Sequence, residues 1–206
     1  MSKLFKILLS PFTFVTIYGF FILYIYYQEH SLKVSVEKFK NSYFKTYEIA
    51  TDNSILLDDI ANHLTSAVNS KELDSLLHTF DSFKRVKNNF EQMKLIDSSN
   101  ESYSIALQDF KNYYKLAENV AKSMISGDEE SILIVYPKAE IVVELYNLVK
   151  KEFNDIKISS KDNLFNQLNI IDLRVKDILF YGAVLLLFHT SLIILLFITN
   201  RKKWDI

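Results

Sequence analysis

The chain has 206 residues, a formal net charge of −1 and no cysteine. The lack of cysteine excludes disulfides, thiolate metal sites and thiol chemistry. Residues 28–177 are acidic overall, which excludes a basic face for nucleic acid. The only glycine and the only proline in this range are Gly127 and Pro137. So few breakers argue against a β-sandwich or an α/β domain and predict an all-α protein.

Two apolar stretches, residues 7–27 and 178–199, contain no Asp, Glu, Lys or Arg. A bilayer core of about 30 Å is crossed by a helix of about 20 apolar residues. Both stretches are long enough, and we predict two transmembrane helices. No small-x-small cleavage site follows the first stretch, so it is expected to stay attached as an anchor.

The positive charges at the two ends predict the orientation. Two lysines precede the first apolar stretch, and the cluster Arg201–Lys203 follows the second. Under the positive-inside rule, residues 1–6 and the tail 200–206 are cytoplasmic and residues 28–177 lie outside the cytoplasm. The expected layout is a two-pass protein of the bacterial inner membrane with one periplasmic domain.

The first helix of that domain is expected to continue from the first transmembrane helix, because no Gly or Pro separates them. Its apolar seam alternates steps of four and three, as in a coiled coil. The seam occupies positions 32, 36, 39, 43, 46, 50, 53, 57, 60, 64 and 67. The first turn is expected at Ser70–Glu72.

The second helix is expected from about Lys71 to Ile96. Its predicted apolar stripe is Leu73, Leu77, Phe80, Phe83, Val86, Phe90 and Met93. The cluster Asp97–Asn100 breaks this helix and can cap the next one. The third seam is Tyr103, Ala106, Phe110, Tyr113, Ala117, Val120 and Met124, and Gly127 suits the left-handed C-cap position that follows.

The fourth helix is expected to begin near Pro137, because proline is tolerated in a first turn. Its seam is Ala139, Val142, Tyr146, Val149, Phe153 and Ile156. Successive steps of four between Ile156 and Leu168 form a stutter, which would locally unwind a supercoil. The helix then continues through Leu164, Leu168, Ile171, Val175 and Ile178 into the second apolar stretch. Together the helices predict an antiparallel four-helix bundle flanked by two transmembrane helices.

One segment, Phe110–Glu130, adds a resemblance to this layout. Its apolar seam and Gly-Asp ending resemble the four-helix-bundle sensor region of bacterial chemoreceptors and sensor histidine kinases. The matching residues are Phe110, Tyr113, Tyr114, Ala117, Met124, Gly127 and Asp128. The resemblance implies a homodimeric signal-input protein that binds a small molecule or a periplasmic partner. The sequence stops at Ile206, before any HAMP linker or transmitter. The chain is therefore expected to be either one half of a split receptor or a protein that acts through another membrane protein, such as a separate transmitter.

Four polar residues near the first turn form a candidate metal site. Asp59 and His63 share one helix face, and Asp74 and His78 share another. The two histidines are expected at similar heights on neighbouring antiparallel helices, where two Asp and two His can bind zinc or another divalent ion. The alternative is a solvated bundle tip with ordinary Asp–His contacts.

His189 is the ionisable residue near the centre of the second apolar stretch. Thr16 and Tyr18 are expected at similar depth on the first stretch, so a hydrogen bond across the helix pair is predicted. A haem would need a second axial ligand, and His30 lies at the wrong depth. We therefore expect no cofactor.

Arg85, Tyr113 and Tyr114 are the candidate ligand-binding residues. Arginine binds carboxylates and phosphates in a bidentate manner, and the tyrosines can line a pocket. The alternatives are a surface pair between Arg85 and Asp81 and a place for both tyrosines in the core. No phosphate loop, nucleophile elbow or HExxH motif occurs, so we expect no enzyme. A sensor is the first prediction; a membrane-anchored helical scaffold of an envelope complex is the alternative.

Overall fold

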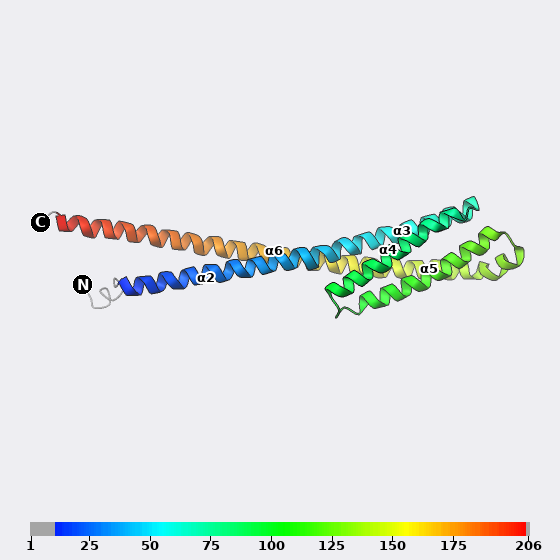
Figure 1. The fold of residues 1–206 in the computed structure, drawn as a ribbon, viewed down its shortest axis with the longest axis horizontal. Coiled ribbons are helices and arrows are strands. Elements are labelled where there is room, and N and C mark those ends of the chain that lie inside the picture. The colour runs from blue at the N-terminus through cyan, green and yellow to red at the C-terminus, as the bar shows by residue number, and fades with distance from the viewer. Residues whose placement is uncertain (1–10, 205–206) are drawn as a thin grey trace. The chain divides into compact units, whose positions relative to one another are not determined.

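The computed structural model describes the backbone of residues 11–204 and the side chains of residues 15–191, 193 and 194. Within this part of the chain every regular element is helical, which confirms the all-α fold class. In chain order the elements are α2 Pro11–Lys38, η1 Phe39–Phe44, α3 Lys45–Ser70, α4 Asp74–Ile96, α5 Ser102–Ser126 and α6 Glu129–Trp204 (Figure 1). The predicted N-terminal segment 1–6, residues 7–10 of the first apolar stretch and residues 205–206 lie outside the described residues.

The chain divides into two compact units. The central bundle is Lys40–Phe165, and the terminal unit contains α2 and the C-terminal part of α6. The predicted periplasmic domain, residues 28–177, is therefore longer than the central bundle at both ends. Helix α6 contributes to both units.

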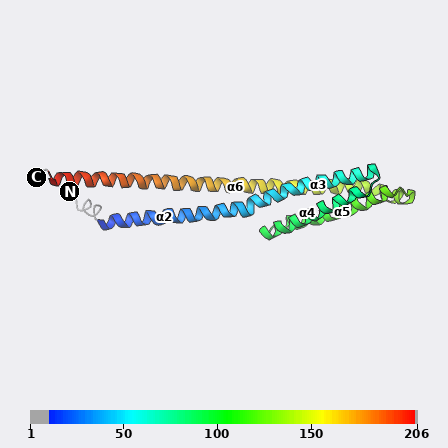
Figure 2. The same cartoon turned by 45° about the horizontal axis from the view of Figure 1, so that its top comes forward.

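Four antiparallel helical segments form the central bundle: α3, α4, α5 and the first part of α6, which lie side by side in both views (Figures 1 and 2). Aromatic side chains from three of these helices meet in its core. The ring of Phe153 lies 5.2 Å from that of Phe90 and 5.7 Å from that of Phe110, measured between centroids. Each fully buried side chain of this size contributes about 1.5–3 kcal/mol, so this cluster is a main source of the bundle's stability.

The predicted seams of α3 and α5 are confirmed inside the bundle. In α3 every predicted position from Thr46 to Ala67 is buried. In α5 the predicted positions from Tyr103 to Val120 are buried, and Met124 is half-buried. Heptad spacing therefore identifies the inward faces of these two helices.

The predicted stripe of α4 is correct only in its second half. Val86, Phe90 and Met93 are buried, but the first half buries Leu76 and Thr79. The hydroxyl of Thr79 donates to the carbonyl of Leu76 at 2.6 Å and lies 3.1 Å from the Tyr114 hydroxyl. A hydroxyl with such partners can be buried at little cost. The residues predicted for this face are exposed: Leu73, Leu77 and Phe80.

Two predicted helix ends are confirmed. Lys71, inside the predicted turn, adopts a left-handed conformation with φ 58° and ends α3. Gly127 has φ 69° and ends α5, a conformation that glycine adopts without the strain of a Cβ atom. Between α4 and α5, the side-chain oxygen of Asn100 accepts the N–H of Ser102 at 3.2 Å.

The predicted start of the fourth helix was wrong. Helix α6 begins at Glu129, and Pro137 lies inside it. The carboxylate of Asp128 accepts hydrogen bonds from the N–H of Ser131 at 3.1 Å and from its hydroxyl at 2.5 Å. It thereby caps an N–H group of the first turn that has no partner within the helix. Proline has no N–H for the carbonyl of Leu133, but the helix continues because the segment before Pro137 is already capped and helical.

The first long helix changes geometry at one place that the sequence did not predict. Residues 39–44 form the π-helical segment η1 between α2 and α3. A π-helical turn accommodates an extra residue without ending the helix, and such turns are frequent at functional sites. The predicted continuity therefore holds, but the regular α-geometry does not. The predicted seam is also wrong at position 36, because Val36 is exposed and the neighbouring Ser35 is half-buried.

The predicted stutter in α6 is present but shorter than expected. The inward positions step by four from Ile156 to Ser160 and from Ser160 to Leu164. Alternating steps then resume, so the half-buried positions that follow are Gln167, Ile171, Arg174 and Ile178. Leu168 and Val175 are exposed, which corrects their assignment to the seam.

The terminal unit pairs α2 with the C-terminal part of α6 in antiparallel register. The ring of Tyr24 lies 4.8 Å from that of Tyr181, and Arg174 donates to the hydroxyl of Ser31. Half-buried positions on α2 alternate steps of three and four, as in a coiled coil. They are Tyr18, Phe21, Ile25, Gln28, Leu32 and Ser35.

Large apolar side chains cover the outer faces of the terminal unit. Examples with more than half of their area exposed are Val15, Phe20, Leu23, Leu179, Phe180, Leu186 and Leu187. Among the described residues, no helix is both apolar enough and long enough to cross a membrane.

Candidate functional site

A cavity of about 380 Å³ lies in the central bundle beside η1, and we call it the polar cavity. Its walls come from η1, α3, the α4–α5 connection, α5 and α6. Hydroxyl, amide and carboxylate groups dominate the lining, including Ser42, Asn100, Ser159, Asp97, Glu152 and Asp155. None of the described residues that line it is Lys or Arg. The cavity is therefore rich in hydrogen-bond acceptors and negative charge.

Glu152 is the most perturbed acid in this cavity. Its Oε2 atom is buried. Partial burial, the nearby carboxylate of Asp109 with its side-chain hydrogen bond to Glu152, and the carboxylate of Asp155 together raise the pKa of Glu152 to about 7, against a small opposing effect of Lys151. Two close carboxylates are not easily ionised together, so near neutrality Glu152 holds its proton part of the time.

A second cavity, of about 400 Å³, lies between α3, α5 and α6, and we call it the apolar cavity. Its lining is mostly aliphatic and aromatic, including Leu64, Val68, Val120, Val142, Tyr113 and Tyr146. The predicted ligand-binding residue Tyr113 thus borders a cavity. Burial raises the pKa of its hydroxyl, and Tyr146 and Asp58 raise it further, so the phenol stays neutral.

A polar network borders the apolar cavity at Tyr146. The hydroxyl of Tyr146 donates to Asp58 at 2.6 Å. Lys150 donates to the same carboxylate oxygen at 2.9 Å and to the Tyr146 hydroxyl at 3.0 Å. Partial burial raises the pKa of Asp58, but the hydrogen bonds from Tyr146 and Lys150 outweigh it and hold the pKa below the usual range. The network ties α3 to α6 through a charged, half-buried carboxylate.

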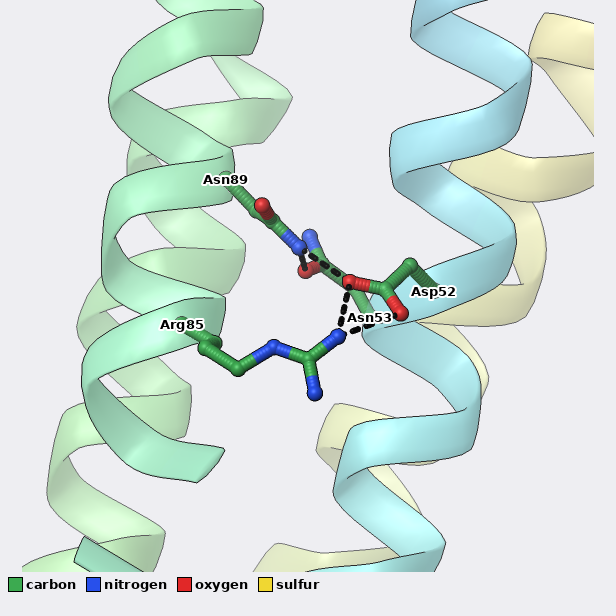
Figure 3. Close-up of polar contacts among 4 residues, drawn as sticks. All are labelled: Asp52, Asn53, Arg85 and Asn89. Atoms are coloured by element: carbon green, nitrogen blue, oxygen red, sulfur yellow. Dashed lines mark hydrogen bonds and ion pairs between the residues drawn. The ribbon is translucent and has the colours of Figure 1, made fainter. Parts of the chain in front are cut away.

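Arg85, predicted as a ligand-binding residue, has a protein partner. Figure 3 shows Arg85 and Asn89 of α4 pointing toward Asp52 and Asn53 of α3. The Arg85 guanidinium lies 3.1 Å from Asp52, so the predicted alternative pair with Asp81 is replaced by a contact between helices. Asn89 donates to Asp52 and to Asn53, at 2.8 Å in each case.

Tyr114, the third predicted ligand-binding residue, is packed in the core. Its ring stacks on Phe83 with centroids 4.3 Å apart, and its hydroxyl pairs with Thr79. Arg85, Tyr113 and Tyr114 therefore have different partners: Asp52 for the arginine, the apolar cavity for Tyr113, and Phe83 with Thr79 for Tyr114.

The polar cavity was missed by sequence reasoning, although a signal for it was present. Thr46 and Ser160 occupy seam positions, where apolar residues are the rule, and both are buried and line the cavity. Polar residues at the same level of two seams could have indicated a hydrated or ligand-binding space between the helices.

The two predicted histidines do lie together at the end of α3 and the start of α4. Their ring centroids are 5.6 Å apart, with the planes tilted by 32°. His63, His78, Asp59 and Asp74 are all exposed. Within the described part of the chain, no group of three or more His, Cys, Asp or Glu side chains is arranged to hold a metal ion. The four-residue metal site stays a prediction.

In the terminal unit, Tyr18 and His189 lie across the helix pair. Their ring centroids are 6.1 Å apart and the planes are tilted by 39°. Thr16, the other predicted partner, lies two residues earlier on α2 and is exposed. The ring contact joins the two helices, and the predicted hydrogen bond of His189 stays a prediction.

Comparisons with protein-family models, with curated proteins and with solved structures find no significant match.

Proposed function

We propose that this protein is a membrane-anchored signal-input module of the bacterial inner membrane. The central bundle binds a small molecule or a periplasmic protein, and a shift of α6 carries the signal across the membrane. One observation carries the proposal: α6 lines both cavities and continues as one helix from Glu129 to Trp204, through the second apolar stretch. A ligand in either cavity would contact the helix that enters the proposed membrane segment.

The membrane anchor is supported by sequence and by surface chemistry. The stretches 7–27 and 178–199 have no charged residue, and the terminal unit exposes many large apolar side chains. Contiguous apolar surface of more than a few hundred Å² is rare on proteins in water and marks a membrane or partner contact. The proposed arrangement places both termini in the cytoplasm and the bundle in the periplasm.

The signal itself is proposed to be a small displacement of α6. A ligand shifts an equilibrium only if it binds one arrangement better than the other. The polar cavity touches η1 and also the stutter between Ile156 and Leu164, two places where the helices depart from regular packing. Shifts of about 1–2 Å at helix interfaces are a known switching mode. A homodimer with a separate transmitter protein would complete the pathway.

The test uses the natural absence of cysteine. Full-length protein carrying Leu23→Cys on α2 and Leu186→Cys on α6, both exposed positions, is spin-labelled in lipid nanodiscs. Small molecules are first screened for a rise in melting temperature, which reports binding to the native state. A binding molecule is expected to change the distance distribution between the labels. Binding ligands that all leave this distribution unchanged would remove the signalling proposal.

A second candidate function, a membrane-anchored scaffold, is favoured by a different observation. The first half of α4 exposes Leu73, Leu77 and Phe80, which form an apolar stripe on the bundle surface. Such a stripe fits a protein contact better than a small-molecule site. If the protein is a scaffold, Leu77→Lys should disrupt its assembly with an envelope partner. Small molecules should then raise the melting temperature of neither the parent protein nor the variant.

A further inference from the structure

The chemistry of the polar cavity selects against anions. Asp97, Glu152 and Asp155 supply three carboxylates to its lining, and no Lys or Arg among the described lining residues offsets them. A carboxylate or phosphate ligand would meet like charge and lack a cationic partner. A positively charged ligand would find carboxylates, hydroxyls and amide oxygens as acceptors.

The aromatic residues of the lining also favour a positively charged ligand. Tyr43 of η1 and Tyr103 of α5 both border the cavity. The face of an aromatic ring attracts an ammonium group, by about 0.5–2 kcal/mol depending on desolvation. A lining that combines carboxylates with aromatic rings is suited to an organic ammonium.

Glu152 provides the specific anchor. This residue lines the cavity, and its side chain has a hydrogen bond with Asp109. The titratable groups that act on Glu152 are Asp109 on α5 and Asp155 and Lys151 on α6, and the cavity adds Asp97 from the α4–α5 connection. Acids outnumber bases around it, so a proton or another cation is favoured at this position.

We propose that the polar cavity binds a small organic ammonium without a carboxylate, and that the ammonium replaces a proton on Glu152. The ammonium would be the ligand of the proposed sensor. Only the effect of binding on α6 rests on the proposed function; binding itself does not. The ammonium donates hydrogen bonds to the carboxylates, and the proton of Glu152 passes to solvent. Because a pKa of about 7 leaves Glu152 mostly protonated at pH 6, affinity should rise about tenfold between about pH 6 and about pH 8.

The experiment measures binding to the full-length chain in phosphatidylcholine nanodiscs by titration calorimetry. The probes are 1,4-diaminobutane and ethanolamine, and the comparison compounds are neutral 1,4-butanediol and anionic succinate. Saturable binding of at least one amine, stronger at the higher pH and accompanied by proton release, is expected. Binding of neither amine, or equal binding of butanediol, would overturn the proposal.

The variant Glu152→Gln is expected to weaken amine binding about tenfold or more and to abolish proton release, because the amide carries no charge. The matched control is Glu144→Gln, an exposed acid on the same helix, which should bind like the parent protein. Should Glu152→Gln fail to fold by circular dichroism, Asp155→Asn replaces it and should weaken binding as well. Unchanged affinity and proton release in the folded variant contradict the inference.

The spin-labelled protein separates this inference from the proposed function. If an amine binds and the distance between the labels at positions 23 and 186 does not change, the ammonium proposal is supported and the signalling function is contradicted. If another ligand changes this distance and no amine binds, the signalling function is supported and the ammonium proposal is contradicted.

Discussion

The side-chain amide of Asn89 on α4 donates a 2.8 Å hydrogen bond to the side-chain oxygen of Asn53 on α3 (Figure 3). Asn53 is only 1% exposed and occupies a seam position. Its own Nδ2 is buried without a partner among the described residues. A polar residue of this kind in a helical seam can fix the register between helices at a cost in stability.

Asn53→Leu is therefore expected to stabilise the bundle. A buried amide without a partner costs about 1–3 kcal/mol, and leucine removes that cost while Asn89 keeps its bond to Asp52. We expect the free energy of unfolding to rise by about 1 kcal/mol, measured by urea denaturation of the full chain in detergent. Asn89→Leu is the opposite change, because it removes the hydrogen bond that the Asn53 oxygen accepts and the bond from Asn89 to Asp52, and it should be destabilising. A loss of stability in Asn53→Leu would mean that the buried amide has a partner in solution.

Phe110→Asp is expected to unfold the bundle. Phe110 is 0% exposed and contacts Phe83 and Phe153, so the substitution buries an unpaired charge. The expected loss is more than about 4 kcal/mol, which is enough to abolish cooperative unfolding by circular dichroism.

Asn112→Asp is the control for that variant, because it adds the same side chain to α5 at an exposed position. Its carboxylate keeps an acceptor for Gln108, and the change should be within about 0.5 kcal/mol. Lys111, which follows Phe110 directly, is half-buried and is a poorer control. Equal losses in both variants would show that the register of α5 is wrong.

The inward faces of α3 and α5 were predictable because each has a sustained heptad pattern of mostly apolar residues, in which Thr46 and Asn53 are the polar exceptions of α3. The first half of α4 was not, since Leu73 and Leu77 fit the heptad as well as Leu76 does, and a tertiary hydrogen bond between Thr79 and Tyr114 decides the register. Hydrogen bonding between distant residues is not visible in a local apolar pattern.

The candidate site shows the same limit. Tyr113 borders a cavity as expected, but the acidic site around Glu152 depends on η1, α3, α5, α6 and the α4–α5 connection meeting at one level. The start of α6 was missed for a local reason: Asp128 and Ser131 form a cap that outweighs the helix-start signal of Pro137.

Tyr146→Phe is expected to raise the pKa of Asp58 toward its usual value. The lost hydroxyl donates at 2.6 Å, and Lys150 stays at 2.9 Å. A carboxyl with a lowered pKa stabilises the fold above its unfolded value of 3.8, and this contribution is lost as the pH falls through the folded pKa. The variant should therefore lose about 1 kcal/mol near neutral pH and less in acid. Carboxyl carbon shifts of Asp58 by NMR measure the pKa; an unchanged value would contradict the network.

Glu152→Gln is expected to change how stability depends on pH. The folded pKa of about 7 lies above the unfolded value of 4.5, so the favourable protonated form is fully present below pH 4.5 and is lost as the pH rises through 7. Glutamine cannot ionise, so the variant should be more stable than the parent at about pH 8, by about 1 kcal/mol after solvent screening, and similar at about pH 4. Urea midpoints at both pH values test this. A parent and variant with parallel profiles would show that Glu152 titrates normally.

The proposed orientation predicts the activity of alkaline phosphatase fusions. The enzyme needs disulfide bonds that form outside the cytoplasm, so its activity reports export. Two lysines before the first apolar stretch and the cluster Arg201–Lys203 after the second favour a cytoplasmic position for both ends. A fusion after Ser102, the first residue of α5, should be active, and a fusion after Ile206 should be inactive. Immunoblots of both fusions control for expression. The reverse pattern would place the central bundle in the cytoplasm and exclude a periplasmic ligand.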